Sequence, residues 1–304
     1  MLLEAFAKIN WSLDITGIRE DGYHLMDMLM QPVSLGDTIR LEPASELTLT
    51  TSGFPLLRPD ERHLALRAAR LLKEETGFPG GASLSVHKRI PVGAGMGGGS
   101  ADAAGVLVGL NRLWGTGLSQ SELEALGLKL GADVPFCIRG GLTRTRGIGE
   151  KMEDLPCGRY YSLLIIQPCR GLSTREVFEA WRESGEMLRP DTDAAAAALR
   201  EGDLAELRRS LGNVLQGVSC EKRPEIARAI QKLKEAGADL ALMTGSGSAV
   251  FGVFRTPARA RAAASVLGGL WRNAFLCRTR QESICFLETE NGAAAGESSI
   301  RSLG

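Results

Sequence analysis

A glycine-rich segment carries the strongest chemical signal in this sequence. Five glycines fall within the seven positions from Gly93 to Gly99, between a predicted strand and a predicted helix. Glycine lets the backbone take positive φ angles and approach a ligand closely. The following helix would offer unpaired N–H groups and the positive end of its dipole. This combination predicts a phosphate-binding loop rather than a flexible surface loop.

The loop differs from two widespread phosphate-binding motifs. It does not end in Gly-Lys-Ser or Gly-Lys-Thr, so it is not a Walker A loop. It also lacks the acidic residue that ends a second strand about 20 residues after a dinucleotide-binding fingerprint. We therefore expect a phosphate loop of another class.

Two charged residues far from this loop could take part in chemistry. Lys8 lies on the polar face of the first predicted strand, where a solvated lysine is the ordinary interpretation. Asp133 lies among apolar residues in the segment 131–136, where it could equally be a helix N-cap with Pro135 in the first turn. Alone, neither residue indicates a function.

Two further segments have both structural and functional interpretations. Tyr23 and His24 follow an Asp-Gly turn and could be an ordinary pair at a strand edge. The small polar segment from Thr244 to Ser248 could be a second loop of close approach or a plain hairpin.

The elements that would position these residues follow from hydrophobic periodicity. Strict alternation predicts a half-buried strand, and a stripe at helical spacing predicts a helix. Ser119 with Glu122 forms a capping-box pattern, and Thr256-Pro257 is a helix start. The predicted strands are 3–15, a stretch from 23, 38–51, 83–88, 160–167, 239–243, 249–254 and 274–287. The predicted helices are 60–76, one after 102, one from 119 to about 131, 173–184, 193–200, 203–212, 224–236 and one from 257.

These elements predict an α+β fold with a boundary between residues 146 and 158, because the first half is strand-rich and the second is mixed. We expect domains at 1–152 and 153–288, and a disordered tail at 289–304.

Composition excludes several classes of protein. The 304 residues carry a formal net charge of zero, which argues against a nucleic-acid partner bound by bulk phosphate attraction. No apolar run reaches the roughly 18–20 residues that span a bilayer, so no membrane partner is expected. Six scattered cysteines, three histidines and no signal peptide predict a cytoplasmic protein without a zinc site.

Together, five segments resemble the GHMP kinase superfamily and, within it, the family of 4-diphosphocytidyl-2-C-methyl-D-erythritol kinases. The resemblance extends over about residues 5–287. Three motifs narrow the resemblance from the superfamily to this family. They are the loop Gly-Gly-Gly-Ser-Ala-Asp-Ala and the segments Asp-Gly-Tyr-His and Gly-Ala-Asp-Val-Pro. The five segments are 7–10, 21–24, 91–104, 131–135 and 243–248.

The resemblance implies roles for individual residues. Lys8 and Asp133 match the catalytic pair. Tyr23 and His24 match residues that hold the cytosine of the substrate, Phe178 matches the aromatic on its other face, and Asn10 lies where the family lines the acceptor pocket. The segment 244–248 matches a loop that supports the active site. The ATP phosphate loop corresponds to Pro91, Val92, Gly93, Ala94, Gly95, Met96, Gly97, Gly98, Gly99, Ser100 and Ala101.

The implied fold has an N-terminal ribosomal-S5-like domain and a C-terminal ferredoxin-like domain. The implied reaction is ATP-dependent phosphorylation of the 2-hydroxyl of the cytidine diphosphate ester of methylerythritol, in the non-mevalonate isoprenoid pathway. Asp133 would accept the hydroxyl proton and Lys8 would steady negative charge. Mg²⁺ would bridge phosphate oxygens with few protein ligands.

The sequence departs from the family at two places. Many superfamily kinases have two serines where this chain has Gly98 and Gly99, with the serine displaced to Ser100, so the metal ligands stay open. His63 stands where the family often has asparagine near the adenine. A GHMP kinase for another alcohol, of the homoserine or mevalonate type, and an inactive nucleotide-binding module are the alternative functions; the oligomeric state is open.

Overall fold

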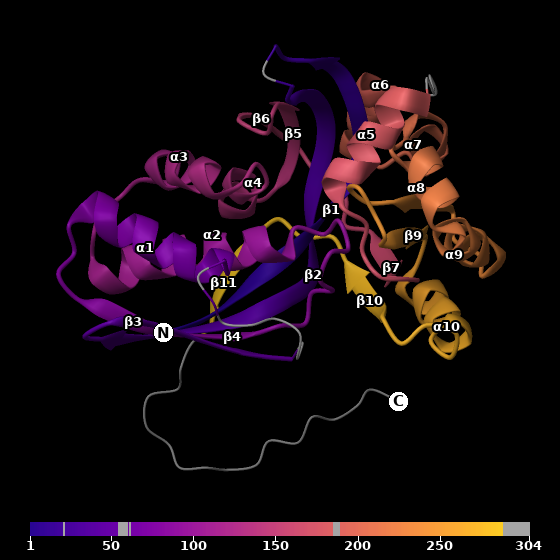
Figure 1. The fold of residues 1–304 in the computed structure, drawn as a ribbon. Coiled ribbons are helices and arrows are strands. Elements are labelled where there is room, and N and C mark those ends of the chain that lie inside the picture. Colours follow the sequence, from indigo (N-terminus) through magenta and orange to yellow (C-terminus); the bar gives the residue numbers. More distant parts are fainter. Residues whose placement is uncertain (21, 54–59, 61, 185–188, 288–304) are drawn as a thin grey trace.

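Two β-sheets organise the described part of the chain, which in this computed structural model comprises residues 1–20, 22–53, 60, 62–184 and 189–287 (Figure 1). The strands of the first sheet are β1 (Leu2–Ile18), β2 (His24–Ala44), β3 (Leu47–Ser52), β4 (Gly81–His87), β5 (Leu142–Gly147), β6 (Lys151–Leu155) and β11 (Ile284–Leu287). The strands of the second sheet are β7 (Ser162–Ile166), β8 (Leu240–Met243), β9 (Val250–Phe254) and β10 (Ala274–Arg278).

The first sheet has the order β11-β1-β2-β4-β3, and β5 pairs with β2 and with β6. Its pairs are antiparallel except for β3 with β4. Strands β1 and β2 are long and form a hairpin that extends beyond the sheet toward the second half of the chain (Figure 1). Their central residues therefore face both halves of the molecule.

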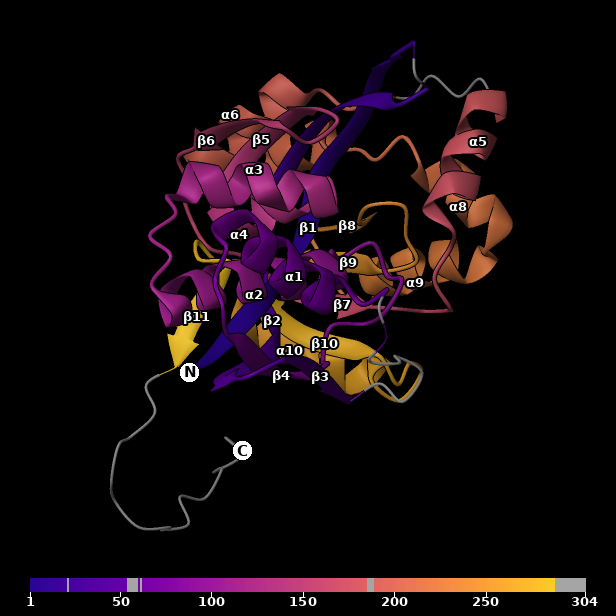
Figure 2. The ribbon, with the colours of Figure 1, turned by 60° about the vertical axis from the view of Figure 1, so that its left-hand side comes forward.

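Four helices lie on one face of the first sheet (Figures 1 and 2). They are α1 (Leu64–Thr76), α2 (Gly98–Trp114), α3 (Gln120–Leu130) and α4 (Val134–Arg139). The predicted capping box at α3 is confirmed, since Ser119 accepts from the Glu122 N–H while the Glu122 side chain accepts from the Ser119 N–H. Helix α1 begins only after His63, whose ring accepts from Ala65 N.

The second sheet is antiparallel, in the order β10-β7-β9-β8. Side-chain caps begin several of its helices, as Asp203 does by accepting from the N–H groups of Ala205 and Glu206. The helices are α5 (Thr174–Ser184), α6 (Thr192–Glu201), α7 (Leu204–Ser210), α8 (Gln216–Lys222), α9 (Pro224–Glu235) and α10 (Pro257–Leu267).

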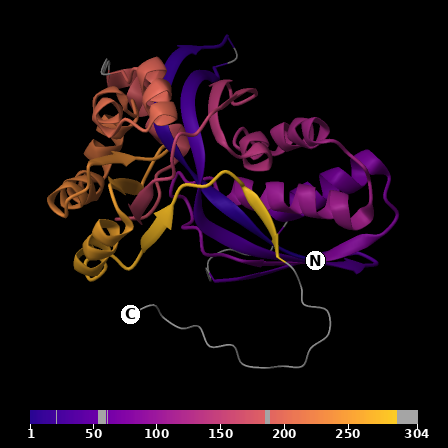
Figure 3. The same cartoon turned by 180° about the vertical axis from the view of Figure 1, so that it is seen from behind.

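The predicted α+β class is confirmed, and several element boundaries differ from the prediction. The stretch 274–287 is two strands in different sheets: β10 joins the second sheet, and β11 returns to pair with β1, as Figure 3 shows from behind. The stretch 38–51 is likewise divided between β2 and β3. Strands β5 and β6 and helix α8 were not predicted. The predicted tail lies outside the described residues, and the domain boundary stays a prediction.

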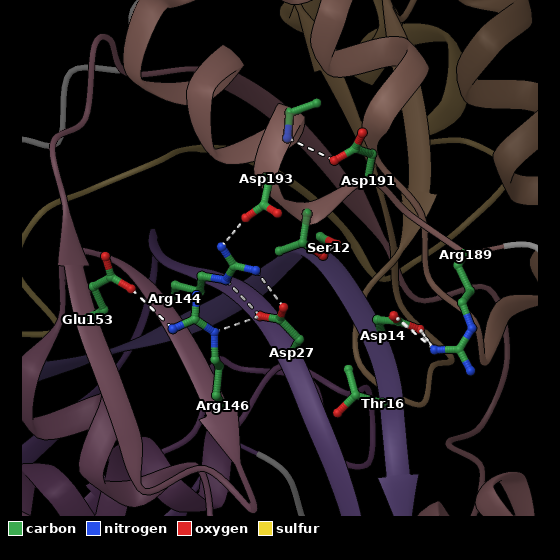
Figure 4. A network of polar contacts seen from close by, with 12 residues as sticks. Ser12, Asp14, Thr16, Asp27, Arg144, Arg146, Glu153, Arg189, Asp191 and Asp193 are labelled. Atoms are coloured by element: carbon green, nitrogen blue, oxygen red, sulfur yellow. Dashed lines mark hydrogen bonds and ion pairs between the residues drawn. The ribbon is translucent and has the colours of Figure 1, made fainter.

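Ion pairs join the two halves beside the β1–β2 hairpin (Figure 4). The Arg144 guanidinium of β5 donates twice to Asp27 of β2, at 2.9 and 2.6 Å, and once to Asp193 of α6, at 2.5 Å. Arg189 donates to both carboxylate oxygens of Asp14 at 3.1 Å. These contacts help to fix the segment that begins α6 against the first sheet.

The described helices include none that has both the length and the hydropathy to cross a membrane.

Candidate active site

Lys8 is buried in the middle of β1. Its side chain is 5% exposed, so the solvated-lysine interpretation is wrong. The ammonium donates to Asn10 Oδ1 at 2.7 Å and lies 3.6 Å from Asp133 Oδ2. A buried ammonium with two oxygen neighbours has a fixed position from which it can meet an incoming anion.

Asp133 occupies the N-cap position of α4, but its side chain makes no capping hydrogen bond. The α4 start instead has Pro135 in the first turn, where a missing N–H costs nothing. The carboxylate is 33% exposed and is directed toward Lys8. The helix-cap interpretation therefore describes the backbone position and not the side chain.

The glycine-rich loop joins β4 to α2 and uses its glycines for two purposes. Gly93, Gly95 and Gly97 have φ angles of 65°, 76° and 70°, which side chains rarely tolerate. A Cβ on Gly95 would also lie 2.4 Å from the carbonyl oxygen of Thr244. Gly97 is the N-cap of α2, and among the residues that the structure describes no side chain caps this helix. The first N–H groups of α2 are therefore available for an anion.

Two cavities meet at this loop. The first has a volume of about 360 Å³ and the second about 1080 Å³. Gly95, Gly97 and Ser100 line both. A ligand in one cavity would therefore reach a ligand in the other across the start of α2.

The predicted site residues divide between these cavities. The first is lined by the whole predicted loop from Pro91 to Ser100 and by His63, whereas Ala101 is buried and lines neither. The second is lined by all six predicted residues outside the loop: Lys8, Asn10, Tyr23, His24, Asp133 and Phe178. The residues predicted to bind ATP phosphates thus line one cavity, and those predicted for catalysis and the acceptor line the other. The roles given to these residues stay predictions.

One end of the second cavity is aromatic. The rings of His24 and Phe178 have their centroids 4.7 Å apart, and Trp181 lies 6.2 Å from His24. Burial lowers the pKa of His24, and the charge of Arg182 lowers it further. His24 Nε2 is buried without a hydrogen-bond partner among the described residues. A neutral imidazole with an unused nitrogen can bond to the edge of a planar heterocycle.

The segment 244–248 is both a hairpin loop and a loop of close approach. It joins the antiparallel neighbours β8 and β9. Thr244 Oγ1 accepts from Asn10 N at 3.0 Å, and Ala249 N donates to Ala94 O at 3.1 Å. The second half of the chain thus supports β1 and the glycine loop directly.

Sequence reasoning missed charged residues in both cavities. Lys88 and Asp102 line the first, and helix α5 brings Arg175, Glu179 and Arg182 to the second. The spacing of the α5 residues, together with Phe178, places them on one helix face, a signal that the sequence contains. Lys88 and Asp102 offered no comparable pattern, because their side chains meet only after β4 packs under α2.

Two family models match the chain. GHMP kinases N terminal domain matches residues 63–141, and GHMP kinases C terminal matches residues 195–273.

Curated relatives and a solved structure are similar over most of the chain. A 4-diphosphocytidyl-2-C-methyl-D-erythritol kinase of Symbiobacterium thermophilum is 46% identical, over 83% of this chain and 90% of the relative. One of Moorella thermoacetica is 41% identical, over 92% and 99%. A crystal structure of 4-(cytidine 5'-diphospho)-2C-methyl-D-erythritol kinase aligns with TM-score 0.79 and 35% identity, over 92% of this chain and 99% of that one. A homoserine kinase from Cytophaga hutchinsonii, at 17% identity and TM-score 0.71, shares the fold.

Proposed function

This chain belongs to the GHMP kinase family and, within it, to the 4-diphosphocytidyl-2-C-methyl-D-erythritol kinases, and from that we propose how its cavities perform the reaction. The enzyme transfers a phosphoryl group from ATP to the 2-hydroxyl of 4-diphosphocytidyl-2-C-methyl-D-erythritol. The products are ADP and the 2-phosphate, and the step belongs to the non-mevalonate isoprenoid pathway.

The observation that carries the proposal is the meeting of the two cavities at Gly95, Gly97 and Ser100. ATP occupies the first cavity and the alcohol occupies the second. The reacting phosphoryl group then lies at the start of α2, beside Lys8 and Asp133. This arrangement holds both substrates so that transfer needs little further motion.

The glycine loop binds the phosphates through its backbone. The positive φ angles of Gly93, Gly95 and Gly97 turn the loop, and the uncapped start of α2 presents N–H groups and a positive dipole. Since phosphoryl transfer has a loose transition state, such fixed dipoles and charges supply much of the catalysis.

Lys8 and Asp133 act on the acceptor hydroxyl and on the transferred group. Asp133 accepts the proton of the attacking oxygen, and Lys8, 3.6 Å from its carboxylate, stabilises negative charge on the phosphoryl oxygens. Asn10 keeps Lys8 in place by accepting from its ammonium. Because the pair is partly withdrawn from water, its charges act at short range with little screening.

Mg²⁺ bound together with ATP would neutralise charge on the phosphates. Within the described ranges no cluster of three His, Cys, Asp or Glu side chains could hold a metal ion by itself. The Asp133 carboxylate offers one oxygen ligand of the type that Mg²⁺ prefers. Such a donor set would fit a metal that takes few ligands from protein side chains.

The aromatic end of the second cavity receives the cytidine of the acceptor. Tyr23 is 61% exposed, so its ring can stack on a base, and stacking contributes about 1–3 kcal/mol. The backbone or imidazole of His24, which lines the same cavity, can bond to the edge of that base. Phe178, whose ring centroid lies 4.7 Å from that of His24, lines the same end of the pocket.

A comparison of two acceptors tests this function. We expect the cytidine diphosphate ester to have a far higher kcat/KM, at saturating ATP, than methylerythritol 4-phosphate without the nucleotide. Loss of a substrate group that a site hydrogen-bonds can cost up to about 10⁴–10⁵-fold. Tyr23→Ala and His24→Ala should each reduce the ratio of kcat/KM between the two acceptors. Tyr160→Ala, which removes a ring that is 58% exposed and lines neither cavity, should leave it unchanged.

Other outcomes would identify other functions. Equal kcat/KM for the two acceptors, or a preference for homoserine or mevalonate, would overturn the assigned substrate and leave the family membership. ATP binding without turnover of any alcohol would indicate an inactive nucleotide-binding module. A cytoplasmic location stays a prediction from the sequence.

A further inference from the structure

Three charged side chains are buried beneath the glycine loop and take no part in the reaction described above. Asp37 of β2 is 0% exposed, Lys88 after β4 is 4% exposed, and Asp102 of α2 is 1% exposed. The sequence separates them widely, and the packing of α2 on the sheet brings them together. Lys88 and Asp102 also line the first cavity.

Lys88 bridges the two carboxylates. Its ammonium donates to Asp37 Oδ2 and to Asp102 Oδ2, the latter at 2.5 Å, and lies 3.4 Å from the carbonyl oxygen of Gly98. Gly98 and Asp102 belong to the first turns of α2, where the loop ends. Lys88 itself stands where the loop begins. Its side chain therefore joins the two ends of the loop.

Asp37 also binds the beginning of the loop through backbone hydrogen bonds. Its Oδ1 accepts from the backbone N–H groups of Arg89 at 2.5 Å and Ile90 at 2.8 Å. The loop is thus anchored on both sides of its glycines, through the charged side chains of one cluster.

This cluster is not expected to stabilise the fold strongly, because burial of its three ionisable groups costs desolvation energy. One ammonium faces two carboxylates, and Asp102 Oδ1 has no hydrogen-bond partner among the described residues. Burial, helped by the nearby Asp37 and opposed by the charge of Lys88, raises the pKa of the Asp102 carboxyl to about 8. Buried ion pairs are often no more stabilising than apolar residues of similar volume, because desolvation offsets their attraction. The cluster is therefore weak evidence for stabilisation of the fold, and its contacts with the loop need a separate account.

We propose that Asp37, Lys88 and Asp102 are positioning residues that fix the path of the glycine loop, so that its N–H groups are arranged for nucleotide phosphates before ATP binds. The proposal rests on the nucleotide site assigned above. Preorganised groups bind a ligand better because less conformational freedom is lost on binding. The cluster acts through the backbone of the loop and does not touch the reacting atoms.

Two variants distinguish the effect of losing the Lys88 bridge from the effect of losing one carboxylate. Asp102→Asn removes one carboxylate and leaves Lys88 bonded to Asp37 and beside Gly98. Lys88→Met with Asp102→Asn removes the bridge, and leaves Asp37 with only the backbone N–H groups of Arg89 and Ile90 as partners. We expect the single variant, which keeps the bridge from Lys88 to Asp37, to raise the KM for ATP about 3-fold, and the double variant to raise it about 10-fold or more, a change that corresponds to about 1.4 kcal/mol.

The accompanying measurements distinguish positioning from a general structural role. In the double variant the KM for the acceptor should change less than about 3-fold. Arg139→Met with Glu124→Gln is the matched control, since it removes a partly buried ion pair between α3 and α4 that lines neither cavity. It should lower the unfolding temperature and leave the KM for ATP unchanged. Equal changes in both KM values, or no change, would overturn the proposal.

Binding without turnover gives an independent test. The affinities of ADP and of a non-hydrolysable ATP analogue, measured by calorimetry without acceptor, should fall in the double variant, and that of adenosine should not. An equal loss for adenosine would mean that Lys88 contacts the base, and the positioning role would be wrong. This measurement does not depend on the identity of the alcohol. If the double variant does not fold, Asp37→Asn should produce the same selective loss, because it weakens the anchor at Arg89 and Ile90.

Discussion

The ammonium of Lys8 and the carboxylate of Asp133 lie 3.6 Å apart, on elements that meet only in the folded chain. The glycine loop passes directly beside this pair. A Cβ on Gly97 would lie 3.2 Å from Lys8 Cγ and 3.7 Å from Asp133 Oδ2. The phosphate loop and the charged pair therefore form one constellation, and a change in either should affect the other.

Asp133→Asn should nearly abolish turnover and leave ATP binding intact. The amide cannot accept the proton of the attacking hydroxyl, and loss of a general base costs about 10²–10⁴-fold. The measurement is kcat at saturating concentrations of both substrates, together with the affinity of an ATP analogue.

Two alanine variants separate the carboxylate chemistry from helix capping. Asp203→Ala removes a true cap from α7 and should cost about 1 kcal/mol in the free energy of unfolding, with kcat unchanged. Asp133→Ala, whose side chain makes no capping bond, should lose turnover with little change in stability. A reversed result would restore the helix-cap interpretation of Asp133.

Gly97→Ala should reduce activity far more than Gly77→Ala. Both glycines have left-handed φ angles, 70° and 65°, so each alanine should lower the free energy of unfolding by about 1–2 kcal/mol. A Cβ at Gly77 meets nothing within 4 Å, whereas one at Gly97 meets the Lys8 side chain. Steady-state kinetics and urea unfolding of both proteins provide the comparison. Equal activities would mean that the approach of Gly97 to Lys8 has no functional consequence.

The sequence predicted the parts of this site that depend on local pattern. The glycine loop, the capping box of α3 and the strand that carries Lys8 each follow from neighbouring residues. The pairing of Lys8 with Asp133 does not, since each residue alone had an ordinary structural interpretation, and only the resemblance to a family joined them.

Long-range packing explains what the sequence did not predict. Strand β11 returns to β1 although its own residues are continuous in pattern with β10. Lys88 meets Asp37 and Asp102 because β2, β4 and α2 converge. Neither arrangement leaves a periodic signal in the sequence.

Thr244→Val should lower kcat/KM about 10-fold, and Thr244→Ser should keep it within about 3-fold. The Thr244 hydroxyl is buried and accepts from Asn10 N, while Asn10 Oδ1 accepts from Lys8. Valine has a similar shape but leaves the Asn10 N–H without a partner, which costs about 1–3 kcal/mol. Serine retains the acceptor. Steady-state kinetics at a temperature well below unfolding provide the measurement. Equal kcat/KM for the two variants would mean that the Thr244 hydroxyl does not help to hold Lys8 in place.

His63 should make the stability of the protein fall at acidic pH. Its Nδ1 accepts from Ala65 N at 3.3 Å and begins α1, so a proton on Nδ1 would abolish the cap. Burial lowers the pKa of His63 below its ordinary value of 6.5, and the charge of Lys88 lowers it further. Between that lowered pKa and about 6.5 the unfolded chain binds a proton that the folded chain does not. The free energy of unfolding therefore decreases as pH falls through this range, by at most about 1.4 kcal/mol per pH unit for one proton.

His63→Asn isolates this contribution. Asparagine retains an acceptor for the cap and does not titrate, so the variant should lose less stability than the natural protein between pH 7 and pH 5. His24 also has a lowered pKa and contributes with the same sign in both proteins, so it cancels in the difference. Urea unfolding at several pH values gives the two curves. Because His63 lines the first cavity, the KM for ATP at pH 7.5 should also change, whereas the KM for the acceptor should not. Parallel stability curves would show that His63 titrates alike in the folded and unfolded chains, and that its bond to Ala65 does not link α1 to pH.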